Sequence, residues 1–180
     1  MKPSCEALNT VCTLYDIDAL HRRVSELAAE ISRAYAGNEL TAIVIMNGGL
    51  FFAADLLRQI DVPVYVDSLA AGSYLHHAST GQLTVRGGMK LDMKGRHVLL
   101  IDDILDTGFT LAELQRVILD AGAASCRTCV LIDKDIPPEK KHAKADWFGF
   151  RAPAEFLVGY GMDSDEHYRN LPDICILRED

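Results

Sequence analysis

Residues 98–110 read VLLIDDILDTGFT, and this stretch predicts a buried strand followed by a ligand-binding turn. The run begins with four apolar residues, as in a parallel strand that is covered on both faces. Two adjacent carboxylates, Asp102 and Asp103, end the run, and a third, Asp106, precedes Thr-Gly-Phe-Thr at the start of a helical pattern. A glycine turn between a strand and a helix lets backbone N–H groups point into one concavity, where the helix N-terminus adds partial positive charge. The stretch therefore predicts a socket for a phosphate monoester.

The side chains around this socket indicate which phosphate compound it binds. Thr107 and Thr110 add hydroxyl donors, and the G-x-x-x-x-G-K-[ST] loop of nucleoside triphosphatases is absent from the sequence. Asp102 and Asp103 would repel a phosphate unless they accept hydrogen bonds from ribose hydroxyls or hold Mg²⁺. A phosphorylated sugar that binds together with a metal ion satisfies both demands.

Strands and helices alternate along the chain on both sides of this stretch. Short apolar runs predict strands and helical periodicity predicts helices. The strands are expected at residues 41–46, 62–69, 97–103 and 126–133, and the helices at 16–36, 50–60 and 110–122. Asp16 is placed to cap the first helix and Gly37 to end it. This order predicts an α/β fold with a central, mostly parallel twisted sheet flanked by helices, and ligands at the carboxyl ends of its strands.

Two regions depart from this alternation. Residues 70–93 are rich in Gly, Ser, Thr and His, which predicts a flap that is mobile until a ligand binds. Residues 145–180 contain short aromatic runs broken by Pro and Gly, which predict a small hood that is completed by the N-terminal segment. Because no linker or internal repeat divides the chain, residues 1–180 are expected to form a single domain.

The composition disfavours several classes of protein. The 180 residues are 49% hydrophobic and carry a formal net charge of −8, so the broad positive field needed for nucleic acid or anionic lipid is not expected. No stretch approaches the ~20 apolar residues of a membrane helix, and the sequence MKPSCEALNT lacks an apolar run of signal-peptide length. We expect a cytoplasmic protein that binds neither nucleic acid nor membranes.

The five cysteines do not suggest a disulfide framework, because their number is odd and their spacing does not repeat. We therefore expect them to be reduced. Cys126 and Cys129 form a C-x-x-C, yet they lie in a predicted strand, where residues three apart point to opposite faces. Buried free thiols are favoured over a metal or redox site at this position.

Residues 98–110 resemble the phosphoribosyl pyrophosphate signature of type I phosphoribosyltransferases, and the likeness to the hypoxanthine-guanine group of that family extends over about residues 14–177. The resemblance implies transfer of a phosphoribosyl group from phosphoribosyl pyrophosphate to N9 of hypoxanthine or guanine, with Mg²⁺ as cofactor. Asp102 and Asp103 would bind the ribose hydroxyls, and Asp106 would also take a proton from the purine. The implied phosphoribosyl-binding residues are Asp102, Asp103, Asp106, Thr107, Gly108, Phe109 and Thr110.

Two other motifs match the family's loops around the sugar diphosphate. MNGGLFFAADL (46–56) resembles the pyrophosphate loop, in which the family has a cis peptide before the glycines. The implied pyrophosphate ligands are Met46, Asn47, Gly48 and Arg169, and Asn47 stands where relatives often have a lysine. Ser73 and Tyr74 match the serine-tyrosine pair of the flexible loop that closes over the reaction and excludes water.

The resemblance also implies a purine pocket and a second metal ligand. Lys134 of VLIDK can only donate hydrogen bonds, so it favours a 6-oxo group over the 6-amino group of adenine. Phe156 would stack on the purine, and the backbone of Leu157 would contact its N1/N2 edge. Asp163 would hold Mg²⁺ on the pyrophosphate side, and Asp102 and Asp103 are the other implied metal ligands.

Several alternatives stay open at the level of sequence. A regulatory protein could sense phosphoribosyl pyrophosphate without turning it over, but such proteins usually add a DNA-binding region or a basic face. The base could instead be xanthine or adenine, and the choice between hypoxanthine and guanine rests on main-chain contacts that residue types do not reveal. The family forms homodimers and homotetramers, and the apolar helix at 50–60 is a plausible dimer surface.

Overall fold

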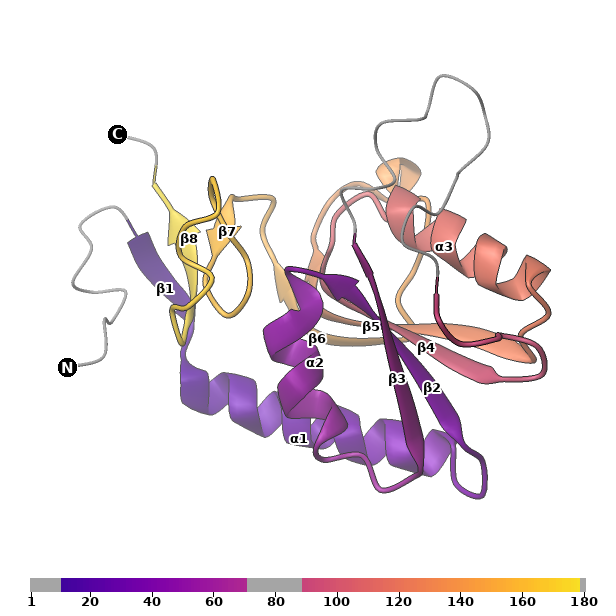
Figure 1. The fold of residues 1–180 in the computed structure, drawn as a ribbon. Helices are drawn as coiled ribbons and strands as arrows, with labels where there is room; N and C mark the ends of the chain where they lie inside the picture. The colour runs from indigo at the N-terminus through magenta and orange to yellow at the C-terminus, as the bar shows by residue number, and fades with distance from the viewer. Residues whose placement is uncertain (1–10, 71–88, 179–180) are drawn as a thin grey trace.

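The computed structural model describes residues 11–70 and 89–178, which form a five-stranded sheet, a three-stranded sheet and three α-helices (Figure 1). The larger sheet has the strand order β3-β2-β4-β5-β6, and every neighbouring pair in it is parallel. Its strands are β3 (Val64–Ala70), β2 (Leu40–Met46), β4 (His97–Leu105), β5 (Ser125–Lys134) and β6 (Trp147–Ala152). The predicted α/β architecture with a central parallel sheet is confirmed.

The central strands are buried on both faces, as their uninterrupted apolar sequences predict. Leu99, Leu100 and Ile101 in β4 are each 0% exposed. The parallel register aligns Val44 of β2 with Ile101 of β4, and Ile101 with Cys129 of β5. Because the strands run in the same direction, their carboxyl ends meet at one edge of the sheet, which is the edge where such folds bind ligands.

Helices cover both faces of this sheet (Figure 1). Helices α1 (Ile17–Ala34) and α2 (Gly49–Leu57) pack on one face, and α3 (Phe109–Asp120) packs on the other, each over its own apolar core. The predicted cap of α1 is confirmed, since the Asp16 carboxylate accepts the Ala19 N–H at 2.7 Å. Within the described ranges, no helix combines the length and the apolar character needed to span a membrane.

Strand β6 belongs to the main sheet, although the sequence pattern places residues 147–152 in the C-terminal hood. It continues the parallel pairing next to β5, which it follows after the short 3-10 turn η4 (Pro138–Lys140). Arg23 of α1 donates to the carbonyls of Phe148 (2.9 Å) and Gly149 (3.0 Å), which ties α1 to this edge of the sheet. Alternating aromatic residues suit an edge strand of either sheet, so the sequence pattern does not distinguish the two positions.

The smaller sheet joins the two ends of the described chain. It consists of β1 (Val11–Tyr15), β8 (Ile174–Leu177) and β7 (Leu157–Val158), which pair antiparallel in that order. Strand β1 is absent from the strands that the sequence predicts. Tyr15 attaches this sheet to β6, because its ring stacks on Phe150 with centroids 4.2 Å apart and its hydroxyl donates to the Arg151 carbonyl at 2.5 Å.

The two cysteines of β5 lie on opposite faces, as predicted. Cys129 is 0% exposed in the core beneath α1 and α2, whereas the partly buried Cys126 packs against the core beneath α3. Burial raises the pKa of the Cys126 thiol to about 12, so it carries almost no thiolate at neutral pH. Cys175 is disulfide-bonded, and the expectation that every cysteine is reduced is therefore wrong.

Candidate active site

A cavity of about 600 Å³ lies at the carboxyl edge of the main sheet. Three separated segments of the chain line it: the end of β2, the turn from β4 into α3, and the loop that contains Asp163 and Arg169. The structure thus brings together most of the residues that the sequence singles out. Those that line the cavity are Met46, Asn47, Gly48, Asp102, Asp103, Asp106, Thr107, Gly108, Phe109, Thr110, Asp163 and Arg169.

Two helices begin at this cavity. Gly48 is the N-cap residue of α2 and Gly108 that of α3, and neither helix receives a side-chain cap. The N–H groups in the first turn of each helix therefore lack the partner that a Ser, Thr or Asp cap would supply. Gly108 has φ +76°, a left-handed conformation that favours glycine at this turn. Two uncapped helix N-termini at one cavity would suit a ligand with two anionic groups.

Gly48, just after β2, lies against both of the other segments that line the cavity. The structure contains the cis peptide that the resemblance implies, between Met46 and Asn47. A Cβ atom placed on Gly48 would lie 2.1 Å from Oδ2 of Asp103, and one placed on Gly161 would lie 2.3 Å from the Gly48 carbonyl oxygen. Any side chain at Gly48 would therefore displace the Asp103 carboxylate.

The cavity is acidic. Its described lining contains five carboxylates, from Asp102, Asp103, Asp106, Asp163 and Glu166, but only the guanidinium of Arg169 as a basic group. Burial, together with the negative charge of Asp103, raises the pKa of the Asp102 carboxyl well above its usual value. A phosphorylated ligand would meet net repulsion in this cavity unless cations accompany it.

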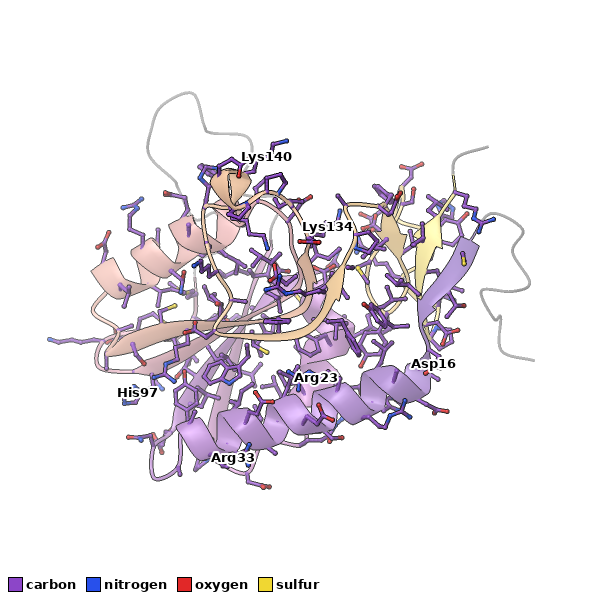
Figure 2. The ribbon with its side chains drawn as sticks, turned by 180° about the vertical axis from the view of Figure 1, so that it is seen from behind. Asp16, Arg23, Arg33, His97, Lys134 and Lys140 are labelled. Atoms are coloured by element: carbon purple, nitrogen blue, oxygen red, sulfur yellow. The ribbon has the colours of Figure 1, made fainter. Side chains whose placement is uncertain are left out.

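Lys134 connects the cavity to the end of β5. Its ammonium lies 3.6 Å from the Asp106 carboxylate, and its side chain is only 14% exposed. Figure 2 shows Lys134 on the side of the main sheet that faces the smaller sheet. None of the three predicted purine residues is among the residues that line the cavity. Lys134 reaches it only through Asp106, Leu157 is buried in β7 at 4% exposure, and Phe156 is 52% exposed.

Arg169 is held in place by its own loop. It donates to the Gly161 carbonyl at 2.8 Å and forms ion pairs with Asp163 (2.8 Å) and Glu166 (3.0 Å). No motif in the sequence marks Glu166 as a residue of the site. Glu166 has φ +61°, so its place at the cavity depends on an irregular turn that residue types do not reveal.

Comparison with known proteins identifies the family. A family model described as the phosphoribosyl transferase domain matches residues 11–165. The chain belongs to the phosphoribosyltransferase family. It is 38% identical over 166 residues to the hypoxanthine-guanine-xanthine phosphoribosyltransferase of Tritrichomonas foetus, covering 92% of this chain and 91% of that relative. It is also 38% identical over 162 residues to the hypoxanthine-guanine phosphoribosyltransferase of Aquifex aeolicus (strain VF5), covering 89% of this chain and 90% of that relative.

Solved structures of phosphoribosyltransferases share the fold. A crystal structure of a hypoxanthine-guanine phosphoribosyltransferase from Bacillus anthracis str. 'Ames Ancestor' aligns with a TM-score of 0.81 at 35% identity, covering 92% of this chain and 96% of that one. The predicted resemblance to the hypoxanthine-guanine group is confirmed. Ser73 and Tyr74, the pair expected in the flexible loop of a phosphoribosyltransferase, lie outside the described residues.

The carboxylates of this phosphoribosyltransferase suit a metal ion that is shared with the substrate. In the part of the chain that the structure describes, no three His, Cys, Asp or Glu side chains are grouped so that they could hold an ion by themselves. Mg²⁺ usually takes one or two carboxylates and completes its shell with water and substrate phosphates. Carboxylates of this number are present, since Asp163 lies on one side of the cavity and Asp102 and Asp103 lie on another.

Proposed function

We propose that this phosphoribosyltransferase works in purine salvage, transferring the 5-phosphoribosyl group from phosphoribosyl pyrophosphate to N9 of hypoxanthine and guanine. The products are the purine nucleotide and pyrophosphate. The observation that carries the proposal is a single cavity in which two uncapped helix N-termini flank the acid pair Asp102 and Asp103. The names of the relatives support the choice of base.

The two helix N-termini and the acid pair suit the three parts of this donor. The first turn of α3 and the hydroxyls of Thr107 and Thr110 would bind the 5′-phosphate. Asp102 and Asp103 would accept hydrogen bonds from the ribose hydroxyls, which lie between the two phosphate groups in the donor. The N-terminus of α2 and Arg169 would bind the diphosphate.

Mg²⁺ is the cofactor that we propose, and the acidic lining of the cavity supports it. Five carboxylates against one guanidinium would repel a donor that carries both a phosphate and a diphosphate. Asp163, with Asp102 and Asp103, would hold the ion together with oxygens of the donor. When bound, Mg²⁺ neutralises charge on the departing diphosphate. Arg169 already lies beside Asp163 and adds a second positive charge at the same place.

Asp106 and Lys134 are proposed to act on the purine. Asp106 is 55% exposed at its side chain and faces the cavity, so it can accept a proton from the purine while N9 forms a bond to C1′ and the bond from C1′ to the diphosphate breaks. Lys134 would donate to the 6-oxo group. We expect Asp106→Asn to lower kcat by roughly 10²–10⁴-fold, with a much smaller change in the KM of either substrate. Equal losses in kcat and in binding would contradict a role in proton transfer.

The test of the function is a direct assay for nucleotide. The protein would be incubated with phosphoribosyl pyrophosphate, Mg²⁺ and one purine at a time: hypoxanthine, guanine, xanthine or adenine. Nucleotide from hypoxanthine or guanine, and none from adenine, is the expected result. Xanthine is included because one relative is named for all three 6-oxopurines. If the donor binds by calorimetry but no purine yields product, the protein is a sensor of the donor and the proposed reaction is wrong.

We also propose that the protein forms a homodimer or homotetramer through α2. Leu50 is 44% exposed and Phe51 is 39% exposed on this helix, directly after the cavity residue Gly48. Adjacent exposed apolar side chains are typical of an interface between subunits. A monomeric mass by light scattering at micromolar concentration would exclude this arrangement.

A further inference from the structure

The segment that follows η4 packs against the proposed 5′-phosphate loop, residues 106–110, from outside the cavity. This segment, residues 141–143, is called the brace below. The backbone N–H of His142 donates to the carbonyl of Thr107 at 2.7 Å. Ala143 lies against the neighbouring residue of the loop, since a Cβ placed on Gly108 would come within 3.0 Å of both its Cβ and its N. The brace therefore contacts two consecutive residues of the phosphate loop.

The hydrogen bond from the brace determines the direction of a peptide group. The peptide between Thr107 and Gly108 is trans, and in a planar trans peptide the C=O and the N–H point in opposite directions. Because the Thr107 carbonyl points at His142, the Gly108 N–H points away from the brace. Gly108 lines the cavity. The brace thus directs toward the cavity one of the N–H groups that would bind the 5′-phosphate.

An ion pair attaches the brace to the sheet. The ammonium of Lys141 is hydrogen-bonded to the carboxylate of Asp133, which is only 8% exposed in β5 and pairs in register with Leu105 of β4. A second cavity, of about 550 Å³, borders this ion pair and the brace. Apolar packing is therefore incomplete around the brace. The neighbouring lysines, Lys140 and Lys144, make no ion pair within the described ranges.

We propose that Asp133 and Lys141 are positioning residues for the sugar diphosphate donor. Their ion pair fixes the position of the brace, so that the His142 N–H reaches the Thr107 carbonyl. This hydrogen bond orients the phosphate loop. The proposal rests on the proposed function, because it takes residues 106–110 as the 5′-phosphate site. Both residues border the second cavity, and the lining of that cavity does not include the proposed purine residues Lys134, Phe156 and Leu157.

The first experiment separates donor binding from purine binding. Lys141→Met removes the ammonium but keeps much of the aliphatic stem. The expected result is a KM for phosphoribosyl pyrophosphate raised on the order of tenfold, because a misplaced phosphate loop weakens a geometry-dependent contact. The KM for hypoxanthine and kcat are expected to stay at the parent values. Lys140, in η4, provides the matched control (Figure 2). Lys140→Met removes a charge without breaking an ion pair, so its KM values and kcat should equal those of the parent.

A second pair of variants distinguishes positioning from a loss of stability. Lys141→Arg keeps a cation beside Asp133 and is expected to restore most of the affinity for the donor. The double variant Asp133→Asn with Lys141→Met leaves no isolated buried charge, so it should fold even if Lys141→Met alone does not. Its KM for the donor is expected to be as high as that of Lys141→Met. An unchanged donor KM, or equal increases in the KM values of both substrates, would overturn the proposal.

Calorimetry of phosphoribosyl pyrophosphate binding with Mg²⁺, in the absence of purine, keeps this proposal separate from the proposed reaction. If the parent binds the donor but forms no nucleotide, the reaction is wrong while the positioning role can still be measured. In that case Lys141→Met must weaken donor binding and Lys140→Met must not. Equal affinities of the parent and Lys141→Met would overturn the positioning role alone.

Discussion

Substitution of Gly48 by alanine is the perturbation that the structure predicts in most detail. Gly48 has φ −57° and ψ −50°, which alanine adopts freely, so the backbone adds no strain. The new Cβ would lie 2.1 Å from Oδ2, 2.5 Å from Cγ and 2.7 Å from Oδ1 of Asp103. Cβ atoms essentially never come closer than 3.0 Å to another heavy atom, so the Asp103 carboxylate must move by about 1 Å or more. The same movement disturbs the hydrogen bond that Oδ1 of Asp103 accepts from the Ile104 N–H at 3.0 Å.

Two measurable losses follow from this movement. Overpacking of this kind costs about 1–3 kcal/mol of unfolding free energy, and for a chain of this length ~2 kcal/mol lowers Tm by roughly 4–8 °C. A displacement of about 1 Å in a group that positions the substrate can lower kcat/KM for phosphoribosyl pyrophosphate on the order of 10²-fold. Calorimetric melting and steady-state kinetics with the donor as the varied substrate measure the two losses.

Two further variants test the cause of these losses. Gly37 has φ +80° with no atom within 4 Å of an added Cβ, and it lies far from the carboxyl edge, so Gly37→Ala should lower Tm through backbone strain alone and leave kcat/KM unchanged. The double variant Gly48→Ala with Asp103→Ala removes the clash and should recover Tm without recovering activity. If Gly48→Ala keeps the parent Tm and the parent KM for the donor, the close contact between Gly48 and Asp103 is wrong.

Three other predictions concern single side chains. Lys134→Met leaves the 6-oxo group without its donor. A lost hydrogen bond of about 1–3 kcal/mol should lower kcat/KM for hypoxanthine roughly 5- to 150-fold, and an unchanged kcat/KM would exclude a role in binding the 6-oxo group. Glu166→Gln frees Arg169 from one of its two ion pairs. Because an exposed ion pair contributes about 0.2–1 kcal/mol, the inhibition constant of pyrophosphate should fall by up to about fivefold. Weaker inhibition by pyrophosphate would contradict this prediction. Burial raises the pKa of the Cys126 thiol to about 12, so a maleimide at pH 8 should label the exposed Cys12 much faster than the partly buried Cys126. Mass spectrometry of labelled peptides measures both rates, and equal rates would contradict the partial burial of Cys126.

The order of strands and helices could be predicted from the sequence. Strand β4 (His97–Leu105) was expected at residues 97–103, and α3 (Phe109–Asp120) at 110–122. These predictions succeed because a strand buried on both faces needs an uninterrupted apolar run, and an amphipathic helix needs apolar residues at helical spacing. The same applies to the Asp16 cap, whose hydrogen bond reaches only three residues along the chain.

The candidate site was predictable where one segment carries it. Residues 102–110 lie together because a single strand and turn hold them, and the resemblance to a known signature supplied their proposed roles. Glu166 was not predicted, because its place depends on an irregular loop packed against distant parts of the chain. The ion pair between Asp133 and Lys141 was not predicted either, because no motif relates those two residues.

The sequence by itself determined the alternation of elements, the parallel sheet and the acidic turn that ends β4, because each depends on residues that are neighbours in the chain. Only the tertiary structure decided that Trp147–Ala152 completes the main sheet, that Val11–Tyr15 pairs with Ile174–Leu177, and that Asp103 lies against Gly48. These arrangements join segments whose contacting residues are at least 18 positions apart in the chain. Many pairings of such segments satisfy the same local pattern, and the simultaneous packing of the whole chain selects one of them.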